Sequence, residues 1–202
     1  MEKNYNYSFE LILKKIKVVD SEWWTKCRLE YQKEFLNENS LNKLAIENFR
    51  AKSKMSSAII SDLTYLETNY KRIDKIKALG LINLYHKLSE HTELEILRSA
   101  SESFVGKNIC LNYRNQRLSH TLLRHTYFCS QILRYTKLNR DKHNVIVDIG
   151  GGYGSLARLL KYLFKKSTLV IFEIPETCML AAYFLKRNFP NANIGQALDF
   201  KE

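Results

Sequence analysis

Four of the seven glycines in this 202-residue sequence lie within five consecutive positions, at Gly150, Gly151, Gly152 and Gly154. The apolar run NVIVDIG precedes them and predicts a buried strand, and SLARLLKYLFKK follows them and predicts an amphipathic helix. Glycine has no Cβ, so it adopts positive φ easily and lets a ligand approach the backbone. A glycine turn between strand and helix therefore predicts an α/β fold with a nucleotide or phosphate at the helix N-terminus.

The residues after this turn repeat the strand–helix pattern. TLVIFEI predicts a second buried strand, PETCMLAAYFLKRNF a helix with Pro175 near its start, and NIGQALDF a third strand. Consecutive units of this kind form parallel sheets with right-handed crossovers. We therefore expect residues 144–202 to form the first half of a Rossmann-like domain, with three parallel strands in an incomplete sheet.

The residues before the turn are predicted to be mainly helical. Residues 1–105 form the expected helical N-terminal region, in which Ser21 and Ser40 can cap helices and apolar residues recur every three or four positions over 53–79. Residues 106–143 are expected to form a hairpin followed by a helix capped by Ser119. The predicted buried side of that helix consists of Leu122, Leu123, Tyr127, Cys129, Ile132 and Leu133.

Composition limits the cellular setting and the partners. The sequence has no run near the roughly 20 apolar residues of a membrane span and no signal-peptide core, which places the protein in the cytoplasm. The scattered Cys27, Cys110, Cys129 and Cys178 have no metal-ligand spacing, and we expect no metal. The net charge of +11 favours an anionic partner, although the basic residues are spread along predicted helices as on a solvated surface.

Two carboxylates flank the glycine turn and narrow the choice of cofactor. Ser155 is a poor match to the last glycine of a dinucleotide fingerprint, whereas Asp148 completes the pattern D-x-G-x-G-x-G. Glu173 ends the next predicted strand, 23 residues after Gly150, where an acid commonly binds ribose hydroxyls. This arrangement resembles the first motif of class I S-adenosylmethionine-dependent methyltransferases. The resemblance implies that the glycine loop and Asp148 hold the methionine part of the cofactor, Glu173 the ribose, and Asp199 the adenine.

Three stretches also resemble the sugar O-methyltransferases of bacterial glycan biosynthesis, namely IVDIGGGYGSLARLL, FEIPETCMLAAYFLKRNFP and RLSHTLLRHTYFCSQI. The resemblance implies methyl transfer from S-adenosyl-L-methionine to a hydroxyl of a sugar or nucleotide-linked glycan. A hydroxyl acceptor benefits from a general base. The candidates on the acceptor side are His120, Arg124 and His125, which lie on the helix before the glycine turn.

Other functions remain open from the sequence. Class I methyltransferase sheets continue beyond three strands, so we expect an incomplete copy whose strand 145–149 is an open edge. The chain could therefore be a truncated, non-enzymatic protein, or half of a split protein whose sheet a partner chain completes. The positive charge also allows an RNA methyltransferase or RNA-binding protein, but no aromatic–basic RNA motif is visible, and nucleic acid is the least favoured partner.

Overall fold

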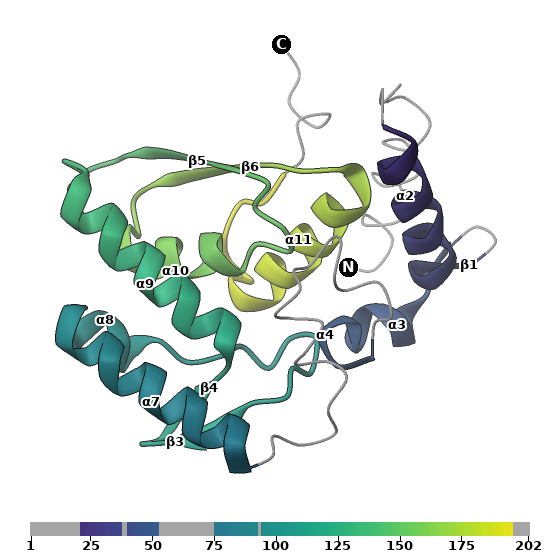
Figure 1. Ribbon diagram of the computed structural model, residues 1–202. Coiled ribbons are helices and arrows are strands. Elements are labelled where there is room, and N and C mark those ends of the chain that lie inside the picture. Colours follow the sequence, from purple (N-terminus) through teal and green to yellow (C-terminus); the bar gives the residue numbers. More distant parts are fainter. Residues whose placement is uncertain (1–20, 38–39, 53–74, 93, 196–202) are drawn as a thin grey trace.

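The computed structural model describes residues 21–37, 40–52, 75–92 and 94–195 (Figure 1). These residues form a mixed α/β structure of helices, a short parallel sheet and two small antiparallel ribbons. Within the described ranges, no helix has the length and apolar character needed to cross a membrane. The helices and the parallel pair of strands confirm the predicted α/β class.

The first described helix, α2 (Glu22–Phe35), begins where the sequence predicts. The Ser21 hydroxyl accepts a hydrogen bond from the backbone N–H of Trp24 at 3.4 Å. The prediction that Ser40 caps the next helix is wrong, because Ser40 pairs in the antiparallel ribbon β1 (Leu36–Asn37)–β2 (Ser40–Leu41). Asn42 caps α3 (Lys43–Glu47) instead, accepting from Ala45 N–H at 3.1 Å, and α4 (Phe49–Lys52) follows.

The helix predicted over 53–79 falls largely outside the described residues. The described part belongs to α7 (Lys75–His91), which continues past the expected end. Gly80 does not end this helix, because Leu81, Tyr85 and Leu88 continue one buried face at steps of three or four. α8 (Leu94–Ser99) follows, in agreement with the helical pattern of that stretch.

The predicted hairpin is confirmed as β3 (Leu111–Tyr113) and β4 (Gln116–Leu118). Arg114 and Asn115 form its two-residue turn with φ of 48° and 61°, the left-handed conformation that such tight hairpins require. Ser119 then caps α9 (His120–Tyr135) by accepting from Leu122 N–H at 3.0 Å. Leu122, Leu123 and Cys129 are buried as predicted, and Ile132 and Leu133 are partly buried. Tyr127 is exposed, because the buried face runs through positions 122, 126, 129 and 130.

The parallel unit consists of β5 (Val145–Ile149), α10 (Ser155–Leu163), β6 (Thr168–Phe172) and α11 (Pro175–Asn188). The two strands pair in parallel, with Val145 opposite Thr168 and Ile149 opposite Phe172. A pair of parallel strands does not by itself define a Rossmann-like domain. The expected third strand lies outside the described residues from position 196, and residues 193–195 before it are not in a strand.

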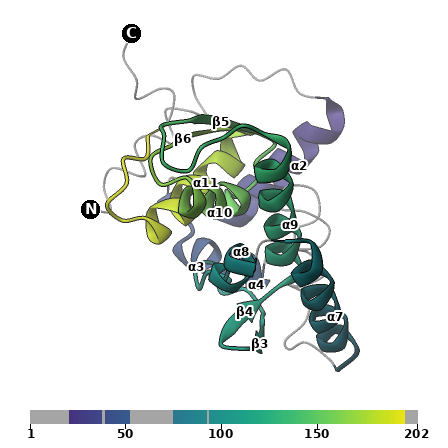
Figure 2. The same ribbon diagram turned by 90° about the vertical axis from the view of Figure 1, so that its left-hand side faces the viewer.

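The two strands were predicted to be buried, and this prediction is wrong for one of their two faces. Ile146 and Leu169 pack against the hydrophobic core on one face. Val145, Val147 and Ile149 point to the opposite face and are 62%, 51% and 83% exposed. The reason is visible in Figures 1 and 2, where α9, α10 and α11 lie on the same side of the β5–β6 pair.

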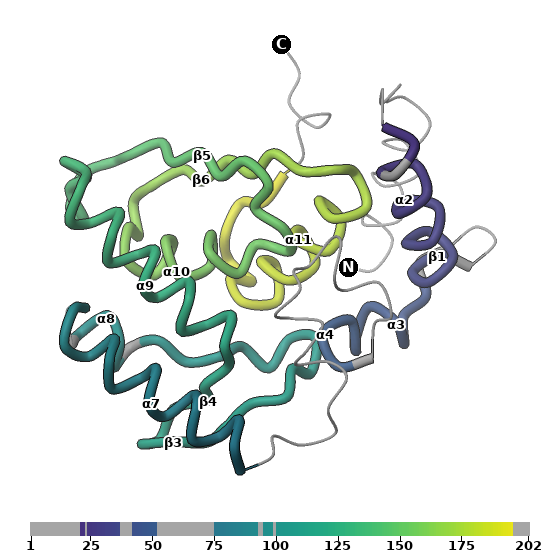
Figure 3. The backbone as a smooth tube through the Cα atoms, in the orientation of Figure 1, coloured from purple at the N-terminus to yellow at the C-terminus, as the bar shows by residue number. Residues whose placement is uncertain are grey.

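Two hydrophobic clusters hold the elements together, and each draws on both halves of the chain. The first joins α7, α8 and α9 to Leu159, Leu160 and Phe164. The second joins α2, α3 and Phe49 to Tyr153 and to α11. Figure 3 shows the path of the chain: α2 and α3 lie near α11, whereas α7 and α8 lie against α9, which packs on α10. The helical N-terminal region and the parallel unit therefore share their cores.

Candidate functional site

The glycine turn between β5 and α10 has an open backbone at one position and a tight contact at the next. Gly150 has φ of 74°, and a Cβ placed on it would meet nothing within 4 Å. A Cβ on Gly151 would lie 2.8 Å from Asp148 Oδ2 and 2.9 Å from the Ile171 side chain. Gly150 therefore leaves its backbone accessible to a ligand, whereas Gly151 allows the Asp148 carboxylate to lie directly against the turn.

Tyr153 anchors the turn in the second hydrophobic cluster. Its side chain is fully buried, and its ring centroid lies 5.3 Å from that of Phe49 and 5.1 Å from that of Phe184. The Arg50 guanidinium carbon lies 5.0 Å from the Tyr153 ring centroid. The turn therefore rests on residues of the N-terminal helical region, a contact between distant segments that sequence spacing did not reveal.

The two predicted carboxylates lie beside the turn. Glu173 Oε1 accepts from the backbone N–H of Gly152 at 3.2 Å, and Oε2 accepts from its neighbour Ile174 at 2.8 Å. Asp148 Oδ2 is shielded from solvent and has no hydrogen-bond partner among the described residues. Burial raises the pKa of Asp148. Burial also raises the pKa of Glu173, with a further increase from the Asp148 charge, while the two N–H donors oppose the shift.

These groups form a site with donors and acceptors arranged around an open turn. The turn ends at Gly154, the N-cap of α10, which provides no side-chain hydrogen bond to the first turn of that helix. Backbone N–H groups at such a helix start attract anionic groups. Asp148 and Glu173 supply acceptors for ammonium and hydroxyl groups. The residues therefore fit S-adenosyl-L-methionine, which has an amino group, a carboxylate and ribose hydroxyls. Asp199 lies outside the described residues.

A buried ion pair fixes the helix that follows Glu173. Glu176, in the first turn of α11, is fully buried and accepts from Arg28 Nε at 3.0 Å and from Gln32 Nε2 at 2.6 Å. Both donors come from α2, at the start of the described chain. Helix α2 therefore holds the segment that carries the predicted ribose-binding carboxylate.

The three candidates for the acceptor side differ in their environments on α9. His120 is exposed, and partial burial of its ring and the Arg124 charge lower its pKa. His125 is mostly buried; burial, followed by the Arg124 charge, lowers its pKa to about 3. Its Nδ1 atom is shielded and has no hydrogen-bond partner within the described ranges. His125 is therefore neutral at pH 7 and a poor general base.

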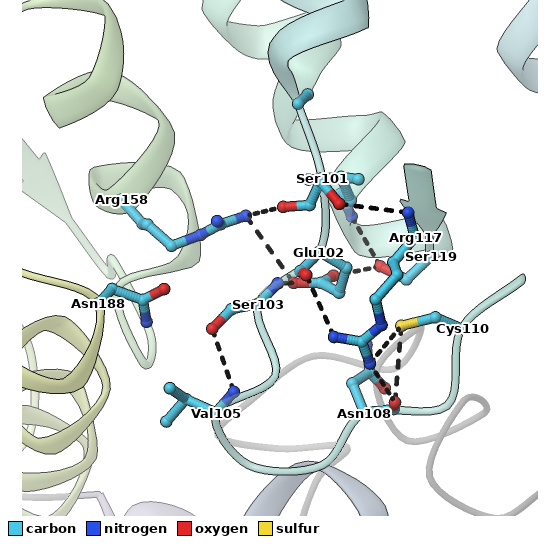
Figure 4. Close-up of polar contacts among 12 residues, drawn as sticks. Ser101, Glu102, Ser103, Val105, Asn108, Cys110, Arg117, Ser119, Arg158 and Asn188 are labelled. Carbon is cyan, nitrogen blue, oxygen red and sulfur yellow. Dashed lines mark hydrogen bonds and ion pairs between the residues drawn. The ribbon is translucent and has the colours of Figure 1, made fainter. Parts of the chain in front are cut away.

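A buried charged network centred on Glu102 was not predicted from the sequence. Arg50 binds both Glu102 oxygens, with Nη1 to Oε1 at 3.0 Å and Nη2 to Oε2 at 2.9 Å. The hydroxyl of Ser119, the N-cap of α9, also donates to Glu102. Arg158 of α10 lies 3.9 Å from the same carboxylate and donates to the Ser101 carbonyl at 2.8 Å (Figure 4). Residues from α4, from the N-cap of α9 and from α10 thus meet at one carboxylate.

The surrounding charges keep the Glu102 carboxyl ionised. Burial raises the pKa of Glu102, but the Arg50 charge and hydrogen bond, with help from Arg158 and Ser119, outweigh it and hold the pKa at about 2. The sequence held one clue to the network. Arg158 occupies a position on the leucine-rich side of its helix, and a charged side chain at such a buried position requires a partner.

Comparisons with protein-family models, with curated proteins and with solved structures found no match to this chain. The resemblance to sugar O-methyltransferases therefore depends on the motifs themselves. Within the described ranges, no three His, Cys, Asp or Glu side chains gather into a metal-binding group, and Cys27, Cys110, Cys129 and Cys178 are free thiols.

Proposed function

We propose that this chain binds S-adenosyl-L-methionine as part of an O-methyltransferase that acts on a sugar or glycan hydroxyl, with residues 144–202 forming a Rossmann-like unit. The observation that carries the proposal is the meeting of Asp148 and Glu173 at the open Gly150 turn, at the start of α10. The sugar acceptor is proposed from the motif resemblance alone.

In this proposal the two carboxylates beside the turn position the cofactor. Asp148, whose carboxylate lies directly against the turn, accepts from the cofactor's amino group. Glu173 accepts from ribose hydroxyls through its remaining lone pairs, while its bonds to Gly152 and Ile174 fix its rotamer. The bound cofactor supplies an activated methyl group, so the protein contributes mainly orientation. On the acceptor side, exposed His120 and neighbouring Arg124 can reach a ligand more readily than buried His125.

Calorimetric titration with S-adenosyl-L-methionine tests this proposal, with ATP and NAD titrated in parallel. Glu173→Gln removes a charged acceptor, and such hydrogen bonds are worth about 1.5–3 kcal/mol, so affinity should fall about tenfold or more. The matched control is Glu95→Gln, because the Glu95 side chain is 81% exposed and far from the turn in sequence. Tighter binding of ATP or NAD, or equal affinities for the two variants, would contradict the proposal.

A second candidate function is self-association through β5, favoured by the backbone at its open edge. Thr168 N–H donates to Asn144 O, and Gly150 N–H donates to Phe172 O, so the even-numbered residues face β6. Strand alternation then directs the N–H and C=O groups of Val145, Val147 and Ile149 to the opposite edge. No other described strand pairs there. An antiparallel pair of two copies centred on Val147 satisfies all these groups and is self-complementary.

Sedimentation analysis over a range of concentrations tests this pairing. Wild-type chain should form dimers, and Val147→Lys should shift the equilibrium to monomers because a charge at the edge opposes strand addition. Ile76→Lys on α7 is the control, since Ile76 is also a well-exposed aliphatic residue. A wild-type monomer at all concentrations, or equal dimerisation of the two variants, would exclude pairing through β5.

A further inference from the structure

A cavity lies beside the second hydrophobic cluster, and its lining residues have no part in the proposed cofactor site. It has a volume of about 250 Å³, is open to solvent, and is bordered by the end of α3, the loop 104–107 and one side of α11. This volume is slightly below the range of about 300–1,000 Å³ that is typical of small-molecule pockets. The cavity is therefore suited to a small ligand.

The loop that forms one wall is held in a fixed shape. Ser103 Oγ accepts from Val105 N–H at 3.1 Å, and the Gly106 carbonyl accepts from Arg50 N–H at 3.0 Å. Arg117 donates to the carbonyls of Glu102 and Asn108, both at 3.3 Å, as Figure 4 shows. These bonds fix the loop before any ligand arrives.

The same loop presents an aromatic ring to solvent. Phe104 is 78% exposed, although a large apolar side chain normally gains by burial. The Arg117 guanidinium carbon lies 3.8 Å from its ring centroid and supports one face of the ring. Phe104 therefore provides a rigid apolar platform at the edge of the cavity.

The remaining side chains around the cavity supply charge and hydrogen bonds. Lys107 and Arg187 are exposed cations, and Glu47 is a single partly buried acid, so the lining has a net positive charge. Tyr183 also lines the cavity; burial raises its pKa, the Arg187 charge lowers it and the Glu47 charge raises it. With a raised pKa, Tyr183 keeps its proton at pH 7 and can donate a hydrogen bond.

We propose that this cavity binds an acidic sugar, with its carboxylate or phosphate at Lys107 and Arg187, its hydroxyls at Glu47 and Tyr183, and its C–H face on Phe104. An acidic sugar combines the three properties that the lining requires, namely an anion, hydroxyl groups and an apolar face. Gly106 of the cavity and Tyr153 of the glycine turn both pack on Phe49. The binding claim does not depend on methyl transfer, because its test contains no S-adenosyl-L-methionine.

Nuclear magnetic resonance titration with glucuronate, glucose 6-phosphate, glucose and inorganic phosphate tests the proposal. We expect saturable binding of at least one of the two acidic sugars, about tenfold tighter than that of glucose, because glucose lacks the anion and one charge-assisted contact is worth about 1.4 kcal/mol or more. Binding should also be tighter than that of inorganic phosphate, which lacks the hydroxyls and the apolar face. The preferred acidic sugar identifies whether a carboxylate or a phosphate is bound. No saturable binding by folded protein, or equal binding of phosphate alone, would overturn the proposal.

Variants locate the binding. Lys107→Asn and Phe104→Ala should each weaken acidic-sugar binding several-fold, since they remove an ion pair and the platform. Arg114→Asn is the matched control for Lys107→Asn, because Arg114 is also an exposed cation with positive φ, and asparagine tolerates that conformation. Equal losses in Lys107→Asn and Arg114→Asn would show that overall charge attracts the ligand, and would refute the site.

Discussion

The substitution Glu102→Gln tests whether the buried charged network stabilises the fold as its geometry indicates. Gln keeps the shape of the side chain but leaves the buried Arg50 and Arg158 without their counter-charge. Breaking a buried pair in this way typically costs about 3–5 kcal/mol. The lowered pKa supports the same range, because a fall from 4.5 to about 2 corresponds to roughly 3 kcal/mol.

Urea denaturation followed by circular dichroism measures this change as a difference in the free energy of unfolding at pH 7. The matched control is Glu95→Gln, which breaks the 3.5 Å pair with Arg140 at a position where the Glu95 side chain is 81% exposed. Surface pairs of this kind contribute about 0–1 kcal/mol. A loss below about 1 kcal/mol for Glu102→Gln, or one equal to that of the control, would refute the stabilising role of the network.

Two further predictions concern acid stability and glycine packing. The pKa of His125 is about 3 in the folded protein, whereas the imidazole of the unfolded chain takes up a proton near pH 6.5. The free energy of unfolding is therefore unaffected by His125 above pH 6.5. It falls by about 1.4 kcal/mol per pH unit on acidification towards pH 4.5. His125→Phe should flatten this slope in urea titrations at several pH values, and an unchanged slope would assign it to other groups. Gly151→Ala should destabilise the fold by about 1–3 kcal/mol, because the added Cβ would overlap Asp148 and Ile171. Gly80→Ala should stabilise the fold by about 0.5–1 kcal/mol, because Gly80 lies within helix α7 and a Cβ there meets no other atom. Thermal unfolding of the two variants should show shifts of opposite sign, and equal shifts would contradict the close contact at Gly151.

Local signals in the sequence correctly predicted several helix starts and the strand–turn–helix unit. The caps at Ser21 and Ser119 depend on a side chain and an N–H group three residues away, so neighbouring sequence contains the needed information. The strand, turn and helix around Gly150 are confirmed for the same reason. Ser40 has the same local signal as Ser21, but pairing between β1 and β2 overrides it.

The errors arose where long-range contacts decide the outcome. An apolar strand such as 145–149 is predicted to be buried, but its exposure depends on which elements cover each face of the sheet, and Val147 lies on the face without helices. The neighbourhood of Asp148 and Glu173 could be predicted, because adjacent parallel strands end at one edge. The Glu102 network could not, since its partners Arg50 and Arg158 lie more than 50 residues away on either side.

The most direct test of the proposed cofactor site is to locate the bound ligand on the backbone. Amide resonances of isotopically labelled protein, recorded during titration with S-adenosyl-L-methionine, report where contact occurs. The account predicts saturable shifts at Gly150, Gly152 and Ile174, whose N–H groups lie in the turn or bond to Glu173. Absence of shifts in a folded sample, or saturable shifts confined to other regions, would contradict the assignment of the glycine turn as an S-adenosyl-L-methionine site.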